Sequence, residues 1–345
     1  YAQLYCNRST SAGLSPYAAT GSALSVASGR VSYVFNYGQP AMSVDTACSA
    51  SLLAIHICIY ARLSEGCRGL SIAGGVNLTL SAINTATINA AGMLSMDSRC
   101  KALDSLADGY GRGEAAGVFL LAHFPVEQKW SDSSKMLFNF ESTAANQDGR
   151  SGSLTAPNGM SQRQVIHTAV SRAVNIDSLM DFSVHGTGTI LGDPIEISAI
   201  GAVLISTPPI KQPSMSRLVA SKTVLGHTEA AAGLAALMQV SESACFRLLV
   251  PLMHLRNVNP YVAAECHNTC LPRNTMHASC GAVGVSAFAF MGSNVHVIIL
   301  SEYLGPDVTK RSHILPWDRT HAWKEEGPND ITCFTAPRAR FNSFR

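Results

Sequence analysis

One cysteine, Cys48, stands between a short apolar run and a longer one in the stretch AMSVDTACSASLLAIHICIY. Apolar residues recur on nearly every face from Ser49 to about Leu63, and Gly66 follows, which predicts a buried helix. Cys48 would lie in its first turn, where unpaired N–H groups and a partial positive charge lower a thiol pKa. The Cys48 N–H would be placed to donate to an oxyanion. Position alone leaves a second interpretation open, an inert buried cysteine at a strand-to-helix turn.

Two histidines also stand where an apolar run gives way to a helix. His185 opens the stretch HGTGTILGDPIE, in which two glycines permit a tight turn and an Asp-Pro pair suits the start of a helix. His227 opens HTEAAAGLAALMQV, whose small residues let another backbone approach closely. The alternative for His185 is a hydrogen-bonded structural histidine. Lys222, five residues before His227, would ordinarily be a solvated surface charge.

The elements that must position these residues alternate in type along the chain. The predicted strands are Met42–Val44, Leu70–Ala73, Val118–Ala122, Phe182–His185, Leu218–Ser221 and Val295–Leu300. Ala-rich helical segments lie between them, so the sequence predicts an α/β fold with a central sheet. Phe288 and Phe290 alternate before a Gly-Ser-Asn turn, which predicts a strand–turn–strand unit. The polar stretch at 146–162 predicts an ordered surface loop.

Composition narrows the class of protein. With 345 residues, 47% hydrophobic and 14% charged, the chain can bury one large core or two fused ones. The net charge of +2 is spread, which argues against nucleic acid and anionic membranes as partners. No apolar run reaches the roughly 18 residues of a membrane span. Ten irregularly spaced cysteines predict reduced thiols in an intracellular, cytoplasmic location, with a plastid left open.

Neither a metal site nor a complete chain is expected from the sequence. The strongest group of metal-ligand residue types is Cys266, His267, Cys270 and Cys280. Their spacing matches no standard zinc site, so we expect no metal. The chain opens on Tyr1 rather than Met, so we expect a fragment of a longer product. After about Ser301, prolines and charges predict a loosely packed linker.

Four motifs together resemble those of the β-ketoacyl synthase family, most closely the ketosynthase domains of type I polyketide synthases. They are DTACSAS, HGTGTILGDPIE, KTVLGHTEAAAG and GVSAFAFMGSNVH, supported by AGMLSMDSRCKALDSLADGYGRGE and NQDGRSGSLTAPNG. The resemblance implies a thiolase-like, five-layered αβαβα fold of two similar halves. The N-terminal half would be residues 1–125, carrying Cys48 and lacking its first strand and helix. The C-terminal half would be residues 126–301, and residues 302–345 would be a post-ketosynthase linker.

The resemblance also implies a reaction, the decarboxylative Claisen condensation of polyketide or fatty acid chain elongation. Cys48 would accept an acyl group from a carrier-protein phosphopantetheine thioester. His185 and His227 would donate N–H groups to the malonyl thioester oxygen and stabilise the enolate that forms as CO₂ leaves. The N–H groups of Cys48 and Phe290 would hold the oxyanion when the enolate attacks.

The family supplies further expectations around this set. Lys222 would hold the two histidines electrostatically, with Glu229 in the same polar network. An acyl carrier protein would be the partner, the chain would be a homodimer, and further polyketide synthase domains could flank it. We expect no bound cofactor. The thiolases pair Cys with His and Cys, and initiating synthases pair Cys with His and Asn, so a Cys-His-His set favours elongation.

One loop departs from the family's pattern, and other functions stay open. Ala289 and Met291 stand where the family has glycines, which would cost about 1 kcal/mol each if φ had to be positive. This departure and the expected missing start favour a second hypothesis, a catalytically silent ketosynthase-like domain that binds carrier protein as a structural or gatekeeping partner. A third, a cysteine hydrolase using Cys48, is weak because nothing marks a residue that would activate water.

Overall fold

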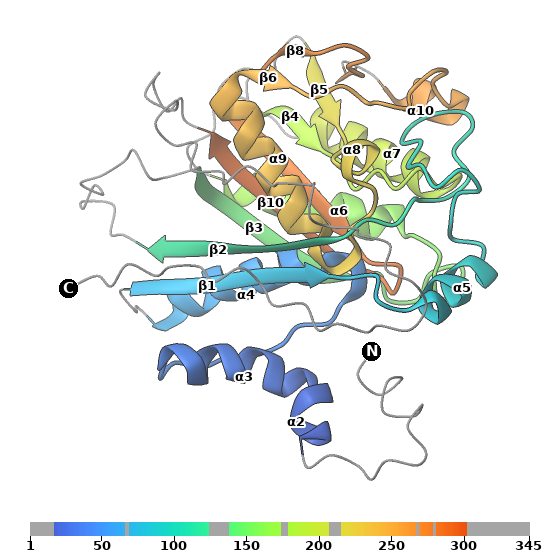
Figure 1. The fold of residues 1–345 in the computed structure, drawn as a ribbon. Helices are drawn as coiled ribbons and strands as arrows, with labels where there is room; N and C mark the ends of the chain where they lie inside the picture. Colours follow the sequence, from blue (N-terminus) through green and yellow to red (C-terminus); the bar gives the residue numbers. More distant parts are fainter. Residues whose placement is uncertain are drawn as a thin grey trace. The chain divides into compact units, whose positions relative to one another are not determined.

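Strands and helices alternate through the part of the chain that the computed structural model describes, residues 17–65, 69–123, 138–173, 179–206, 215–266, 269–278 and 281–301 (Figure 1). These residues all belong to one unit, and residues 302–345 lie outside the described residues. The predicted linker at 302–345 therefore stays a prediction.

A six-stranded sheet forms the centre, in the order β3-β10-β9-β4-β5-β7. Its strands are β3 (Asn139–Gln147), β4 (Leu179–Ser183), β5 (Ser216–Val219), β7 (Thr269–Cys270), β9 (Gly281–Phe288) and β10 (Ser293–Ser301). Strand β10 runs antiparallel to both β3 and β9, whereas β9, β4, β5 and β7 are mutually parallel. The β9–β10 hairpin confirms the predicted strand–turn–strand unit.

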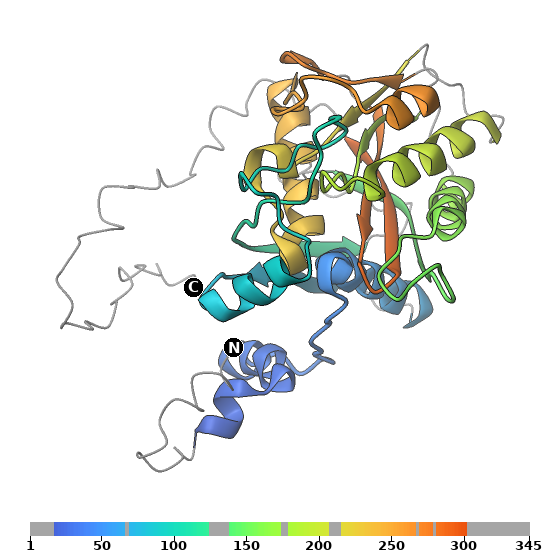
Figure 2. The ribbon, with the colours of Figure 1, turned by 90° about the vertical axis from the view of Figure 1, so that its right-hand side faces the viewer.

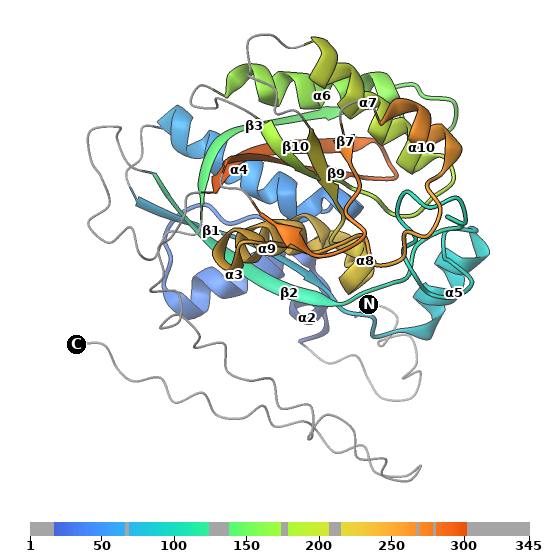
Figure 3. The same cartoon turned by 90° about the horizontal axis from the view of Figure 1, so that it is seen from above.

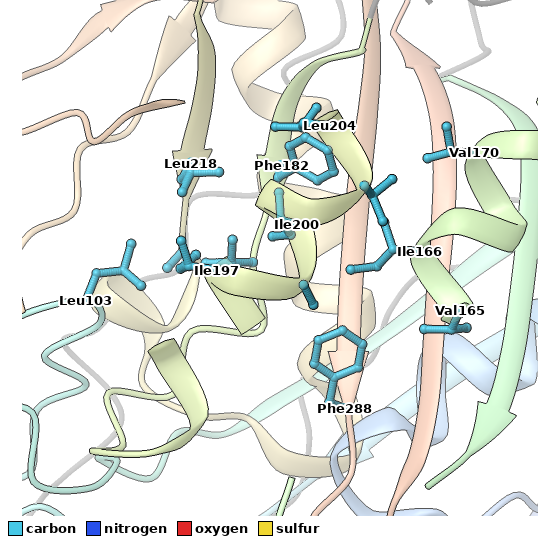
Figure 4. Packing of buried hydrophobic residues seen from close by; sticks show 14 of the residues in the cluster. Leu103, Val165, Ile166, Val170, Phe182, Ile197, Ile200, Leu204, Leu218 and Phe288 are labelled. Carbon is cyan, nitrogen blue, oxygen red and sulfur yellow. The ribbon is translucent and has the colours of Figure 1, made fainter. Parts of the chain in front are cut away.

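Two helices, α6 (Gly159–Arg172) and α7 (Gly192–Ser206), cover one face of this sheet, as the green helices in Figure 2 show. The Asn158 side chain caps α6 by accepting the N–H groups of Met160 and Ser161. Branched and aromatic side chains of the helices and sheet interlock between them without exposure (Figure 4); they include Ile166, Phe182, Ile197, Ile200 and Leu218. This core holds the start of α7 against the ends of β4 and β5.

The other face is covered by α4 (Ala50–Glu65) and α9 (Ala232–Phe246), and beyond them lies a two-stranded antiparallel sheet of β1 (Gly69–Asn77) and β2 (Ala115–His123). Seen from above, the order is α6 and α7, the central sheet, α4 and α9, then β1 and β2 (Figure 3). A Cβ at Gly233 would lie 2.7 Å from Leu52 Cβ, so a glycine lets α9 approach α4 closely. This confirms the predicted role of the small residues after His227.

Shorter elements complete the described chain. They are α2 (Ala18–Ser22), α3 (Leu24–Phe35), α5 (Ala82–Ala90), α8 (Lys222–Leu225), α10 (Pro260–Glu265), β6 (Leu248–Leu249), β8 (Met276–His277) and the 3-10 turns Ala47–Ser49 and Glu229–Ala231. No described helix has the length and apolar character needed to cross a membrane.

Several predicted boundaries needed correction. Met42–Val44 is not a strand, because no strand of the described residues pairs with it and Met42 is 58% exposed. Strand β4 begins three residues before the predicted Phe182, and β3 was not predicted as a strand at all. The helix after Cys48 is confirmed as α4, although among its side chains from residue 50 to 61 only Leu52 and Ile55 are large and fully buried.

Candidate active site

Cys48 lies in the 3-10 turn Ala47–Ser49 that leads directly into α4. Ala47 has φ +50°, a left-handed conformation that is unfavourable for a residue with a Cβ. The turn is held by hydrogen bonds, since the Asp45 carboxylate accepts the Ala47 N–H at 3.2 Å and Ser49 Oγ donates to the Thr46 carbonyl at 3.2 Å. The sulfur is thereby fixed at the start of the helix.

The structure brings the two predicted histidines to this sulfur. His227 Nε2 lies 3.0 Å from Cys48 Sγ, although 179 residues separate them in sequence. The His185 and His227 rings stand edge to face with centroids 5.7 Å apart. Tyr110 packs edge to face on the other side of His227, with ring centroids 4.8 Å apart. Cys48, His185 and His227 therefore form one cluster.

Backbone contacts indicate which nitrogen of each imidazole carries the hydrogen. The Glu229 N–H donates to His227 Nδ1 at 3.3 Å, and the Phe288 N–H donates to His185 Nδ1 at 3.3 Å. A neutral imidazole that accepts at Nδ1 carries its hydrogen on Nε2. Burial and the Lys222 cation lower the pKa of both histidines well below the ordinary value, so both rings are neutral at pH 7. Each ring thus offers an Nε2–H donor.

The His185 segment is anchored by two buried carboxylates of α7 that the sequence analysis did not single out. Glu196 accepts the N–H groups of His185 at 2.6 Å and of Gly186 at 2.9 Å. Asp193 accepts those of Gly188 at 3.1 Å and, from a distant loop, Leu103 at 2.7 Å. Burial raises the pKa of Glu196 to about 7 and that of Asp193 to about 6. The sequence signal that could have indicated these two carboxylates was their place in the GDPIE part of the motif.

The thiol of Cys48 behaves differently from the expectation. Burial raises its pKa to about 11, because the loss of hydration outweighs the opposing effects. Those effects are the Lys222 cation and hydrogen bonds from the N–H groups of Phe290 and of Cys48 itself. The predicted net lowering is therefore wrong, since a helix terminus does not offset burial here. The role of the Phe290 and Cys48 N–H groups as an oxyanion pair stays a prediction.

Lys222 and Glu229 have different foremost partners, although both act on the Cys48 thiol. Lys222 is 3% exposed, and burial lowers its pKa while Glu196, foremost, raises it. Glu229 instead forms a bidentate ion pair with Arg112, with Nε 2.7 Å from Oε1 and Nη2 3.0 Å from Oε2. Lys222 lowers the pKa of Cys48 and Glu229 raises it. Arg112 was missed, although it stands in the quoted stretch ADGYGRGE.

The loop that carries Phe290 does not show the strain that its sequence suggested. In this loop Gly292 adopts the left-handed conformation, with φ +87°, whereas Ala289 and Met291 do not have positive φ. Gln147 Nε2 donates to the Met291 carbonyl at 2.7 Å, and the Asp148 N–H donates to the Gly292 carbonyl at 2.9 Å. The predicted energetic cost of Ala289 and Met291 required a positive φ at these residues, and the structure does not show one.

The cysteine and histidine residues considered for a metal are not shown as a site. His267 and Cys280 lie outside the described residues, and Cys266 and Cys270 are free thiols. Across the residues that the structure describes, no group of three or more His, Cys, Asp and Glu side chains is placed to hold a metal ion.

Comparison with known proteins identifies the family. The model of the β-ketoacyl synthase N-terminal domain matches residues 2–124, and that of the C-terminal domain matches residues 137–256. Together these ranges take in more than half of the chain. The chain belongs to the β-ketoacyl synthase family. Both motif histidines and the motif cysteine of this ketosynthase lie within the matched ranges.

Curated relatives of the ketosynthase are polyketide synthases. A phenolphthiocerol/phthiocerol polyketide synthase of Mycobacterium tuberculosis is 39% identical over 285 residues, which are 81% of this chain and 15% of that protein. Non-reducing polyketide synthase olcA of Penicillium canescens is 36% identical over 318 residues, 88% of this chain and 13% of that protein. The chain thus spans a small part of the length of these relatives.

Solved ketosynthase structures share the fold. The oxazolomycin ketosynthase domain of Streptomyces albus superposes with a TM-score of 0.76 at 31% identity, covering 88% of this chain and 52% of that one. The ketosynthase from module 6 of the bacillaene synthase of Bacillus subtilis gives 0.75 at 28% identity, covering 82% and 50%. The predicted α/β, thiolase-like fold class is therefore confirmed.

Proposed function

We propose that this ketosynthase is an active condensing enzyme, which joins an acyl group held on Cys48 to a malonyl-type thioester with loss of CO₂. The observation that carries the proposal is the assembly of both histidine rings beside the Cys48 sulfur. His227 Nε2 lies 3.0 Å from Cys48 Sγ, and the His185 ring stands edge to face with the His227 ring. Neutral donors in a buried site stabilise developing negative charge strongly.

In the first step Cys48 becomes acylated. Its sulfur attacks the carbonyl of a phosphopantetheine thioester, the old C–S bond breaks, and the Cys48 proton leaves with the pantetheine thiol. The tetrahedral oxyanion is held by the N–H groups of Phe290 and Cys48. Lys222 favours the thiolate that this step requires, because its cation lowers the pKa of Cys48 against the effect of burial.

In the second step the malonyl thioester loses CO₂. The electrons of the broken C–C bond form an enolate, whose oxygen is stabilised by the Nε2–H groups of His185 and His227. The enolate carbon then attacks the acyl carbonyl on Cys48, and the β-ketoacyl product leaves on the carrier as Cys48 regains a proton. The electrons for the new bond come from the substrate itself, so the reaction needs no redox cofactor. We propose an acyl carrier protein as the partner and a homodimer as the working state.

The alternative is a silent domain that binds carrier protein without condensing. One of its grounds was the substituted loop, and the backbone conformations of Ala289 and Met291 do not have the positive φ that would make these substitutions costly. All three reactive side chains are present and assembled.

The test incubates the protein with an acyl-pantetheine thioester and malonyl carrier protein. Intact mass is expected to show an acyl adduct that disappears in Cys48→Ala, and chromatography should show a β-ketoacyl product. Adduct formation without product would favour the silent domain. An adduct that persists in Cys48→Ala would remove Cys48 as the nucleophile, and free acid released from the adduct would support the hydrolase hypothesis.

A further inference from the structure

Arg112 makes a buried, three-point contact beside the reactive cluster. Its Nε and Nη2 pair with the two Glu229 oxygens at 2.7 and 3.0 Å, and its Nη1 donates to Thr85 Oγ1 at 2.7 Å. The side chains of Arg112 and Glu229 are 7% and 18% exposed. A planar guanidinium in this arrangement holds a carboxylate in both position and orientation.

Glu229 needs such support because its backbone is in an unfavourable conformation. Its φ is +43°, in the left-handed region that residues with a Cβ avoid. In this conformation its N–H donates to His227 Nδ1 at 3.3 Å. Relaxation of the turn would move that N–H away from Nδ1. The imidazole hydrogen of His227 could then sit on Nδ1 instead of Nε2.

The main chain around Arg112 holds His227 as well. The His227 N–H donates to the Gly111 carbonyl at 2.7 Å, and the Gly113 N–H donates to the His227 carbonyl at 2.8 Å. The Arg112 side chain therefore contacts Glu229, two residues after His227, while the backbone of Gly111 and Gly113 on either side of Arg112 hydrogen-bonds to the His227 backbone. Movement of the guanidinium changes the turn while the histidine backbone stays fixed.

We propose that Arg112 is a positioning residue that, through Glu229, keeps His227 as the Nε2–H tautomer aimed at Cys48. Arg112 does not touch the reacting atoms. The consequence for turnover rests on the proposed condensation, whereas the consequence for the tautomer does not. An ion pair that only stabilised the fold would leave the tautomer unchanged when weakened.

The chain offers a matched control in a second buried pair. Arg217 contacts Asp181 with Nε 2.5 Å from Oδ1 and Nη2 2.8 Å from Oδ2, and these side chains are 12% and 5% exposed. Arg217 and Asp181 lie on β5 and β4, and their ion pair is not directed at Cys48 or the two histidines. Arg217→Lys removes the same kind of bidentate guanidinium–carboxylate contact as Arg112→Lys.

The experiment compares Arg112→Lys, Glu229→Gln and Arg217→Lys by ¹⁵N NMR of imidazole-labelled protein and by CO₂ release from malonyl carrier protein. We expect His227 to lose the pure Nε2–H signature in the first two, and kcat to fall roughly tenfold to a hundredfold with little change in KM, as for other partners that orient an imidazole. Arg217→Lys should keep both readouts, whatever its melting temperature. Thr85→Val removes one hydrogen bond of Arg112 and should shift the tautomer in the same direction by a smaller amount. It replaces the Arg112 and Glu229 variants as the test if those do not fold.

Two results would overturn the inference: an unchanged His227 tautomer in every folded variant at the Arg112 contact, or an equal tautomer shift in Arg217→Lys. A wild-type protein that releases no CO₂ would contradict the proposed function instead, and the tautomer comparison would still decide the role of Arg112.

Discussion

The two histidines offer the same donor but are held in different ways. Each Nδ1 accepts a backbone N–H at 3.3 Å, from Phe288 for His185 and from Glu229 for His227. Each neighbourhood contains a left-handed residue with nearly the same φ, +44° at Gly186 and +43° at Glu229. Glycine adopts this φ without strain, whereas glutamate needs the Arg112 ion pair. Both histidines thus depend on a distant part of the chain: His185 accepts directly from Phe288, 103 residues away, whereas the turn beside His227 is held by an ion pair across 117 residues.

The largest expected effect comes from removing either donor. His185→Ala and His227→Ala should each slow CO₂ release by roughly 10²–10³-fold, the usual cost of losing one donor to a developing oxyanion. His167→Ala, at an exposed ring on α6, is the control for a lost histidine. Wild-type CO₂ release in both site variants would exclude the histidines from decarboxylation.

Glu196→Gln tests the carboxylate that anchors the His185 segment. The amide retains one acceptor but turns a donor toward either the His185 or the Gly186 N–H, which leaves a buried donor unsatisfied. We expect a loss of about 2 kcal/mol in unfolding free energy in urea. CO₂ release should fall with it, and a variant as stable and active as wild type would show that these hydrogen bonds do not hold His185.

Gly186→Ala tests the strain-free glycine of the same segment. A left-handed Ala costs about 1–2 kcal/mol, and its Cβ would lie 2.9 Å from Val184 Cγ2. Gly149→Ala has a similar φ of +63° but open space around the Cβ. Urea unfolding should show the larger loss at position 186, and equal losses would mean that close packing there contributes nothing.

The pH dependence of stability should report both buried rings. Their pKa values in the folded protein lie well below 6.5, so below pH 6.5 the unfolded chain binds protons that the folded one does not. Unfolding free energy should therefore fall as the pH drops below 6.5, by up to about 1.4 kcal/mol per pH unit for each ring. His227→Gln should flatten the slope. A slope unchanged by both His185→Gln and His227→Gln would contradict neutral buried rings.

Sequence patterns predicted the parts of the site that are local. Cys48 before a helix, and His185 before a glycine turn, could be recognised because each pattern lies within a few residues, and the small residues of α9 indicated its close approach to α4. The fold class followed from the alternation of elements and from four family motifs. Met42–Val44 was wrong because strand formation depends on a partner, which apolar character does not supply.

Properties that depend on distant contacts could not be predicted in this way. The Cys48 pKa is raised because surrounding elements remove water, which a helix position does not reveal. Arg112 and Glu229 are each ordinary surface residue types in sequence, and only the folded chain pairs them.

The most direct test is a single turnover of protein acylated beforehand on Cys48. Malonyl carrier protein is added, and CO₂, β-ketoacyl product and remaining acyl adduct are measured in the same reaction. The proposed condensation predicts one CO₂ and one β-ketoacyl product for each acyl group lost from Cys48. CO₂ release without product, or loss of the acyl group as free acid, would contradict it.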